Sequence, residues 1–379
     1  MSGTYPKRPT AALIDHAALS FNVRSIREFI GPGAKFMAVI KANAYGHGVV
    51  ECSQTLEKAG VEWFGVATLE EALELRENGI SSQILCFGSV WPGQEREFFE
   101  HFITPAIFSS ETAIRLDEAA RKYGVEARVH LKLDTGMGRV GLRFDEVEQF
   151  LSAIEGLRNL RITGLMTHFA AADDLSQVNF TRLQMARFNE ALELFSEAGI
   201  DPEFVNMANS PGAVVFPKSR GNMVRIGGIM YGLGDDVLPR DVHGPELKPV
   251  LSLVTKVAVV KRIKSGESIG YGRSYKATHE LTAAVLPLGY NDGYSRSLSG
   301  RAEVLIRGVR CPVLGRISMD WISVDASKIP DISPGEDVVL IGRSGNESIT
   351  AADLAGISGS ISYEITCGIG QRVPRIHIK

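Results

Sequence analysis

The sequence predicts an α/β protein, with an N-terminal (β/α)8 barrel of the TIM type followed by a mainly β C-terminal domain. The first observation is that, through about residue 230, eight short apolar runs alternate with amphipathic stretches, as in strand–helix units. The second is that, after about Pro245, runs rich in Val, Ile and Leu are separated by Gly, Pro, Ser and Asn, which is typical of antiparallel strands. A length of 379 residues also fits two domains.

The expected barrel strands span 36–40, 64–67, 83–87, 103–107, 128–133, 162–167, 204–207 and 223–226. Helices between them include 69–78, 111–123, 144–155 and 182–198. Thr68 and Glu71 form a capping-box pattern at the start of the first of these helices. Eight strands favour a closed barrel, and a doubly wound open sheet is the alternative. No GxGxxG motif opens a helix, which weakens that alternative.

The second domain is expected to contain strands over 251–263, 281–288, 301–306, 322–325 and 337–341, and one helix over 350–355. We therefore divide the chain into a barrel domain over 1–245 and a β-rich domain over 246–379. The first ~10 residues fit either domain, because boundaries are the least certain part of such a division.

Composition and charge exclude several classes of function. The chain has 41 basic and 44 acidic residues and a net charge of −3, so nothing favours nucleic acid or an anionic membrane. No apolar run approaches the ~18 residues of a membrane span, and the N-terminus lacks an apolar signal region. The cysteines are far apart, which suggests neither a metal site nor a disulfide framework: Cys52, Cys86, Cys311 and Cys367. We expect a cytoplasmic protein without a metal ion.

The first expected strand ends in a lysine, Lys41, followed by Ala-Asn-Ala-Tyr-Gly-His-Gly. In a barrel of this kind, the C-terminal ends of the strands carry the active site. A lysine there can form a Schiff base, because desolvation lowers its pKa and frees the amine. An ordinary solvated lysine is the alternative, but the glycines and polar residues that follow favour a site.

Two further strands carry polar residues toward the same end of the barrel. The strand over 128–133 alternates with a period of two, so that one face is apolar and the other carries Arg128, His130, Lys132 and Asp134. We expect the polar set to line the barrel interior, although a half-exposed edge strand has the same pattern. A glycine-rich turn then presents Arg139, and the next strand ends at His168.

The last two barrel strands lead into small, polar turns. Asn209, Ser210 and Gly212 follow one strand, and Gly227 and Gly228 follow the other. Phosphate frequently binds in the loops after strands 7 and 8 of such barrels. A hydroxyl and backbone N–H groups can hold a dianion, and the absence of a Walker lysine favours a cofactor phosphate over a nucleoside triphosphate.

Together these segments resemble the alanine racemase family, from about Ala11 to Arg375. The stretch AVIKANAYGHG resembles the family's cofactor-lysine signature. The other matching segments follow in the family's order: KLDTGMGRVG, MTHFA, ANSPG, VRIGGIMYGL, GYG, LPLGYNDGY, GRISMD and ISYEI. The resemblance implies a barrel followed by a β domain, assembled as a head-to-tail homodimer with active sites shared across the interface.

The resemblance also implies the chemistry. Pyridoxal phosphate would be bound to Lys41, and L- and D-alanine would be interconverted by two bases, Lys41 and the partner subunit's Tyr271. The product D-alanine would supply cell-wall peptidoglycan. Two acid–base groups are needed because the proton must be removed from one face of Cα and returned to the other.

The remaining roles are implied in the same way. Arg225 would bind the pyridine nitrogen, Arg139 would lie near the cofactor phenolate and the substrate carboxylate, and His168 would help to set the pKa of Tyr271. Lys132 matches a lysine that is often carbamylated and would then orient Arg139. The phosphate would be bound by Tyr45, Asn209, Ser210, Gly227 and Tyr363. Met319 and Asp320 would meet the substrate carboxylate, and Tyr290 and Arg296 would line the channel through which substrate enters.

Two positions depart from the family's pattern: Ser318, where many members have cysteine, and Asn206, where many have histidine. Three alternatives remain open. The first is a racemase for serine or another amino acid on the same scaffold. The second is a non-catalytic pyridoxal-phosphate-binding homeostasis protein, which would not need the β domain. The third is a related decarboxylase, which the GYG and SMD segments disfavour.

Overall fold

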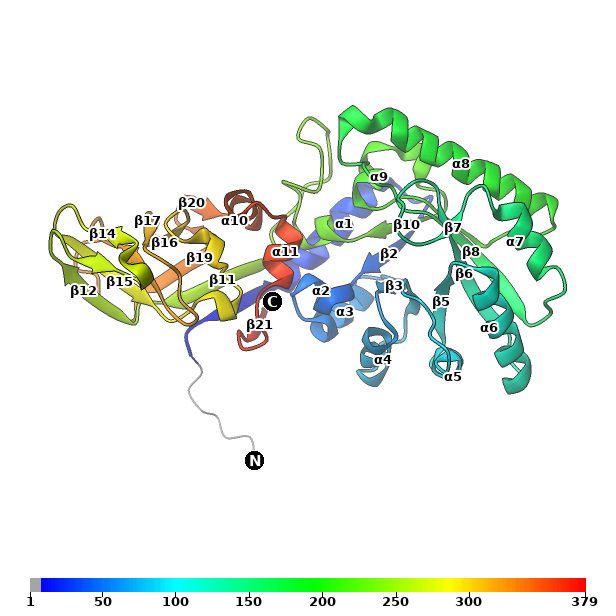
Figure 1. The fold of residues 1–379 in the computed structure, drawn as a ribbon, viewed down its shortest axis with the longest axis horizontal. Coiled ribbons are helices and arrows are strands. Elements are labelled where there is room, and N and C mark those ends of the chain that lie inside the picture. The colour runs from blue at the N-terminus through cyan, green and yellow to red at the C-terminus, as the bar shows by residue number, and fades with distance from the viewer. Residues whose placement is uncertain (1–7) are drawn as a thin grey trace. The chain divides into compact units, whose positions relative to one another are not determined.

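The structure is a computed structural model that describes residues 8–379 and divides them into two compact units (Figure 1). The barrel unit comprises residues 19–44 and 49–247. The β unit comprises residues 8–18, 45–48 and 248–379. The expectation for the start of the chain also concerned residues 1–7, which lie outside the described residues.

The barrel unit is built around eight parallel strands that form a nearly closed ring, which confirms the predicted fold class. The strands follow one another in the order β10 (Met223–Ile226), β2 (Lys35–Val39), β3 (Trp63–Val66), β4 (Gln83–Cys86), β5 (Ile103–Ile107), β6 (Ala127–Asp134), β8 (Leu160–Met166) and β9 (Phe204–Asn206). A short strand, β7 (Leu142–Arg143), pairs with β6. Backbone bonds join the region of β9 to that of β10: Asn222 N–H donates to the Val205 carbonyl (3.2 Å), and Arg225 N–H donates to the Ala208 carbonyl (3.0 Å).

Helices connect these strands, as the alternating pattern predicted. They are α1 (His16–Ile30), α3 (Val49–Lys58), α4 (Leu69–Glu77), α5 (Glu95–Glu100), α6 (Ser110–Tyr123), α7 (Val147–Ile154), α8 (Val178–Glu197) and α9 (Ser210–Val215). Thr68 begins α4 with the predicted capping box: its hydroxyl accepts from Glu71 N–H, and the Glu71 side chain accepts from Thr68 N–H. Helix α8 begins at Val178, earlier than the predicted 182.

The barrel interior contains a buried apolar cluster and one buried histidine. The buried members of the cluster are Met37, Trp63, Leu85, Ala106, Met166 and Met223. The ring of His130 lies 5.6 Å from the rings of both Trp63 and Phe204, centroid to centroid. Burial, together with the positive charges of Arg225 and Arg128, lowers the pKa of His130 to about 3. The ring is therefore neutral and acts as a packing element.

The β unit contains one large sheet that is antiparallel except for one parallel pair, between its first strand and its last strand in chain order. In spatial order the strands are β12 (Val259–Ile263), β15 (Leu281–Leu286), β18 (Ile322–Asp325), β17 (Val309–Leu314), β16 (Glu303–Ile306), β19 (Asp337–Ser344), β11 (Leu251–Lys256), β1 (Ala11–Asp15) and β21 (Arg375–Ile378), with β20 (Glu347–Ile349) paired to β19. A separate hairpin joins β13 (Ser268–Ile269) and β14 (Tyr275–Lys276). Two helices complete the unit, α10 (Ala351–Ser358) and α11 (Ser362–Cys367).

The single strand predicted over 251–263 is wrong, because the structure divides it into β11 and β12. The chain changes partners at the break: Val257 N–H donates to the Glu336 carbonyl, beside β19, and Ala258 N–H donates to the Val285 carbonyl of β15. An uninterrupted apolar run does not reveal such a change of partner. Across residues 8–379, every helix is too short or too polar to cross a bilayer.

Candidate functional site

Lys41 is separated from the end of β2 by one residue, Ile40, and begins an unusual turn, labelled α2 (Lys41–Tyr45) in Figure 1. The next four residues, Ala42 to Tyr45, all have φ between 52° and 54°, so the turn is left-handed. This conformation costs roughly 1–2 kcal/mol per residue other than glycine. Strained backbone of this kind is found mainly where the surrounding structure fixes it, often at functional sites.

Hydrogen bonds hold both sides of this turn. Ala44 N–H donates to the Ile40 carbonyl (2.8 Å), and Val49 N–H donates to the Asn43 side-chain oxygen (2.7 Å). Asparagine also tolerates the left-handed region better than most residues. The turn therefore fixes the path of the chain after β2 and the position of the Lys41 backbone.

Lys132 lies near the end of β6 and is buried, in keeping with its place on the polar face of that strand. Burial lowers the pKa of Lys132 to about 8, and the positive charges of Arg139, Arg225 and Lys41 act in the same direction. This end of the barrel therefore gathers four positive charges, from β2, β6 and β10 or the turns that follow them. Such a site favours an anionic ligand.

Arg225 on β10 is buried and surrounded by oxygen acceptors. Its guanidinium donates to the Asn206 carbonyl (2.8 Å) and side-chain oxygen, to the Thr167 carbonyl (2.6 Å) and to the Met207 carbonyl (3.2 Å). Burial lowers the pKa of Arg225 to about 9. These contacts fix the plane of the guanidinium, and Asn206 provides two of them.

His168 lies at the end of β8, where Nδ1 is 3.4 Å from a guanidinium nitrogen of Arg225. Burial lowers the pKa of His168 well below its usual range, and the charges of Arg225, Lys132, Arg139 and Lys41 reinforce the shift. The imidazole is therefore neutral near pH 7 and keeps one nitrogen able to accept a hydrogen bond.

The two turns expected to bind phosphate come together in the structure. Gly227 N–H donates to the Ser210 hydroxyl oxygen (3.0 Å), which leaves the hydroxyl proton of Ser210 available for donation. The Asn209 side chain accepts from Gly212 N–H (3.0 Å) and caps α9. The predicted pairing of these two loops thus holds in space, and Asn209 shapes the turn that carries Ser210.

Tyr45 and Tyr363 are neighbours within the β unit, with ring centroids 5.4 Å apart. Gly46 beside them has a φ of 85°, and a Cβ atom there would lie 2.1 Å from the Thr366 carbonyl oxygen. Only glycine fits this close approach. Arg375 also donates to the Gly46 carbonyl (2.9 Å), which secures the segment that carries Tyr45.

Tyr271 lies in a short turn between β13 and β14, and 71% of its surface is exposed. Gly270 and Gly272 on either side have φ of 79° and 68°, so the turn depends on glycine. Within the described residues, the Tyr271 side chain is exposed to solvent rather than enclosed in a pocket of the β unit.

Another part of the β unit brings Tyr290 beside Met319 and Asp320. Tyr290 N–H donates to the Ser318 carbonyl (3.1 Å), and a Cβ atom on Gly289 would meet that carbonyl at 2.1 Å. The Ser318 side chain bonds to both backbone groups of Trp321, so serine here stabilises the turn. Arg296 is exposed and lies in a separate turn over Arg296–Leu298, in which Leu298 is buried.

Sequence reasoning missed Arg372, which organises this region. Its guanidinium pairs with Asp320 (2.8 Å) and with the buried Asp292 (2.7 Å), and it donates to the Met319 carbonyl (3.2 Å). Arg8 pairs with the same Asp292 (2.8 Å). These partners are far apart in the sequence and belong to no short motif, so no local signal could have identified them.

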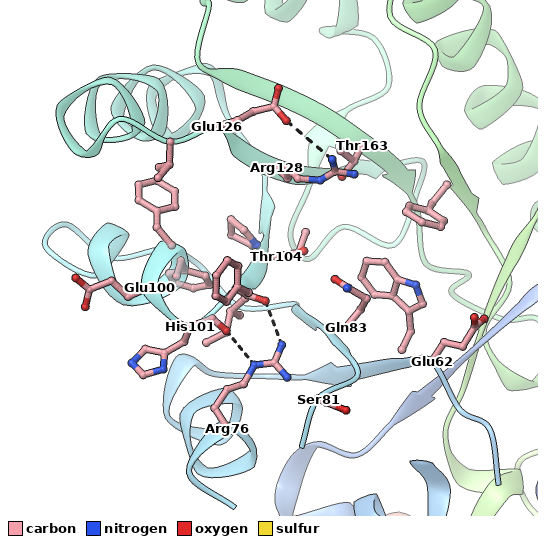
Figure 2. Close-up of a pocket in the computed structure, with 18 of the residues that line it drawn as sticks. Glu62, Arg76, Ser81, Gln83, Glu100, His101, Thr104, Glu126, Arg128 and Thr163 are labelled. Carbon is pink, nitrogen blue, oxygen red and sulfur yellow. Dashed lines mark hydrogen bonds and ion pairs between the residues drawn. The ribbon is translucent and has the colours of Figure 1, made fainter. Parts of the chain in front are cut away.

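A pocket of about 960 Å³ lies at the opposite end of the barrel strands, where β3, β4 and β5 begin (Figure 2). Its charged side chains bind neighbouring groups. Arg76 donates to the carbonyls of His101 (2.9 Å) and Phe102 (3.1 Å), and Arg128 pairs with Glu203 (3.0 Å). Because these charges are compensated within the protein, we assign the chemistry to the end that carries Lys41.

Comparisons with known proteins identify the family of the chain. Residues 14–235 match the family model described as alanine racemase, N-terminal domain, and residues 250–377 match alanine racemase, C-terminal domain. An alanine racemase from Halothermothrix orenii is 42% identical over 369 residues, which cover 97% of this chain and 96% of the relative.

Solved structures are similar over the whole chain. An alanine racemase from Bacillus anthracis with bound L-Ala-P has a TM-score of 0.92 and 38% identity, covering 100% of this chain and 96% of the other. An alanine racemase from Bartonella henselae with covalently bound pyridoxal phosphate has a TM-score of 0.87 and 29% identity, covering 98% and 99%.

Proposed function

Because this chain belongs to the alanine racemase family, we propose that it interconverts L-alanine and D-alanine with pyridoxal phosphate as its cofactor. The observation that carries the proposal is the lysine at the end of β2, presented by a left-handed turn toward the cationic end of the barrel. We place the reaction in the cytoplasm, where it supplies D-alanine for peptidoglycan.

The residues present fit this cofactor. Lys41 provides the amine for the covalent link. The Ser210 hydroxyl, oriented by the bond that its oxygen accepts from Gly227 N–H, and the pair Tyr45 and Tyr363 provide donors for the phosphate. Arg225 is a donor that stays charged near pH 7, which suits a ring nitrogen that accepts a hydrogen bond without becoming protonated. When bound, pyridoxal phosphate supplies an electron-withdrawing ring system that stabilises negative charge on the substrate Cα.

The protein residues then move the proton. We assign the two faces of Cα to the Lys41 amine and the Tyr271 hydroxyl, so that one group removes the proton and the other returns it. His168 is neutral and its Nδ1 accepts from Arg225, so its other nitrogen carries the proton and can donate to the Tyr271 oxygen, which would help the phenol to lose its proton near neutral pH.

Three further residues bind and orient the substrate in this proposal. Arg139 and the pair Met319 and Asp320 face the substrate carboxylate. With a pKa of about 8, Lys132 is partly uncharged near neutral pH. That form can add carbon dioxide to give a carbamate with loss of one proton, and the resulting negative charge would orient Arg139. Tyr290 and Arg296 line the substrate channel.

We propose that the enzyme is a homodimer in which Tyr271, Met319 and Asp320 act in the partner's site. The exposure of Tyr271 (71%) and of Met319 (51%) supports this assignment, because acid–base groups and carboxylate contacts work best when shielded from water. A second subunit would provide that shielding.

The first experiment measures D-alanine formed from L-alanine by the purified protein loaded with pyridoxal phosphate. We expect progress toward an equal mixture, and no detectable turnover in Lys41→Ala. Tyr271→Phe should lower kcat by about 10²–10⁴-fold, the usual contribution of a positioned acid–base group. Full activity of Tyr271→Phe in both directions would remove Tyr271 from the mechanism, and an inactive, cofactor-loaded wild type would reject alanine as the substrate.

A further inference from the structure

We propose that Glu71 is a positioning residue for Lys41, because its carboxylate holds in place the left-handed turn of which Lys41 is the first residue. The inference rests on the proposed function in one respect only, the catalytic role of Lys41. Glu71 belongs to α4, outside the residues assigned to cofactor or substrate.

The two carboxylate oxygens of Glu71 bind two different parts of the barrel. Oε1 accepts from Ala42 N–H (2.6 Å), the first left-handed residue after Lys41. Oε2 accepts from Ala67 N–H (2.7 Å), and more weakly from Thr68 N–H (3.4 Å), at the end of β3. Short bonds from N–H groups to an ionised carboxylate are among the stronger hydrogen bonds in proteins.

These contacts join the ends of neighbouring strands. Strands β2 and β3 are paired in parallel, and Ile40 N–H donates to the Gly65 carbonyl (2.9 Å) just before Lys41. Glu71 bridges the chain segments that follow these strands. Lys41 therefore lies between a strand bond on one side and the Glu71 bond on the other.

A capping box explains only half of this arrangement. The box needs one side-chain oxygen at the third helical position, aimed back at the N-cap residue. The other oxygen of Glu71 has no part in α4 and reaches a residue 29 positions earlier in the chain. Ala42 has no polar side chain with which to stabilise its own strained conformation, so the stabilisation must come from elsewhere.

The test is the variant Glu71→Gln. Glutamine also serves at this position of a capping box, so the start of α4 is retained. Its amide has one oxygen, however, so an NH2 group must face one of the N–H groups that the carboxylate now binds. We expect backbone amides of the turn over 42–45 to exchange with deuterium about tenfold faster, and kcat to fall about tenfold, the effect of losing a charged hydrogen bond.

Glu57→Gln is the control for removing the charge of a carboxylate bound to backbone N–H groups; both bonds go to one oxygen of Glu57, Oε1, so glutamine can keep them. Glu57 also accepts backbone N–H bonds with its carboxylate, from Ser81 (2.9 Å) and Ser82 (2.7 Å), but it does so at the end of the barrel where β4 begins. The Glu57→Gln variant should leave both kcat and the deuterium exchange of the backbone amides over 42–45 unchanged. Equal losses in both variants would show general loosening of the barrel and would overturn the proposal.

A second substitution tests the physical reason. Glycine adopts positive φ without steric cost, so Ala42→Gly should reduce the need for the Glu71 bond. The double variant Glu71→Gln with Ala42→Gly is expected to recover part of the lost kcat and part of the protection from exchange. Wild-type exchange and kcat in Glu71→Gln alone, or no recovery in the double variant, would overturn the proposal.

Failure of the proposed function would be distinguishable from failure of this inference. Exchange of the turn is measured on the folded protein with or without pyridoxal phosphate, and borohydride trapping of the cofactor on Lys41 requires no racemisation. A wild type that does not racemise alanine, but whose turn loosens in Glu71→Gln and not in Glu57→Gln, would reject the proposed substrate and keep the role of Glu71.

Discussion

His130 and Lys132 lie two residues apart on the same face of β6, and burial affects them in different ways. The pKa of Lys132 falls to about 8, which keeps the amine near its titration point at the cationic end of the barrel. The pKa of His130 falls to about 3 between two aromatic rings. The first is suited to chemistry, and the second is suited to packing.

The buried His130 should make the fold less stable in mild acid. An unfolded histidine has a pKa of about 6.5 and takes up a proton below that pH, whereas folded His130 does not until about pH 3. The unfolded state therefore binds more protons across this window, so the free energy of unfolding falls as pH falls, by up to about 1.4 kcal/mol per pH unit. His168 acts in the same direction.

Urea unfolding at pH 7 and pH 5 checks this prediction. The loss of stability between the two pH values should be smaller by about 1–2 kcal/mol in His130→Leu than in the wild type. The exposed His279 provides a control, since His279→Asn should leave the loss unchanged. An equal loss in wild type and His130→Leu would mean that folded His130 titrates normally.

Among the elements, strand β8 depends on the absence of a side chain at Gly164. Gly164 is paired with His130 on β6, and a Cβ atom would lie 2.6 Å from its Nε2 atom. We expect Gly164→Ala to lower the free energy of unfolding by about 1–3 kcal/mol, the usual cost of overpacking a core. Because β8 leads to Thr167 and His168, a shift of the strand should also lower kcat.

Gly156→Ala is the control for this strand, since a Cβ atom there meets nothing within 4 Å. Thermal unfolding and racemisation rates of both variants make the comparison. Equal stability of Gly164→Ala and Gly156→Ala would show that the His130 ring moves aside without cost.

The element scale also shows how far the sequence could predict the fold. The eight barrel strands follow from apolar runs of four to eight residues, because that pattern reports burial directly. The split of 251–263 into two strands and the left-handed turn at Ala42 do not follow, because partner exchange and positive φ arise from long-range bonds. The proximity of the loops that carry Ser210 and Gly227 could be predicted, because the loops after the seventh and eighth strands of such barrels often bind phosphate together. The contacts of Glu71 and Arg372 could not, because their partners lie at sequence distances that no motif spans.

On the scale of the whole molecule, the proposal requires two chains for one complete site. Each site would combine Lys41 of one subunit with Tyr271 of the other. A dimer of Lys41→Ala with Tyr271→Ala then has one site that lacks both groups and one that has both. If both groups served the same chain's site, each site of the mixed dimer would lack one of them.

Mixed dimers isolated with a different affinity tag on each variant therefore decide where Tyr271 acts. We expect about half of the wild-type activity per dimer, whereas each variant alone should be nearly inactive, because one of two sites is intact. Sedimentation should show the same dimer for all preparations, which removes differences in assembly as an explanation. Mixed dimers as inactive as the separate variants would place Tyr271 in its own subunit's site, and a monomer in sedimentation would require a mechanism within one chain.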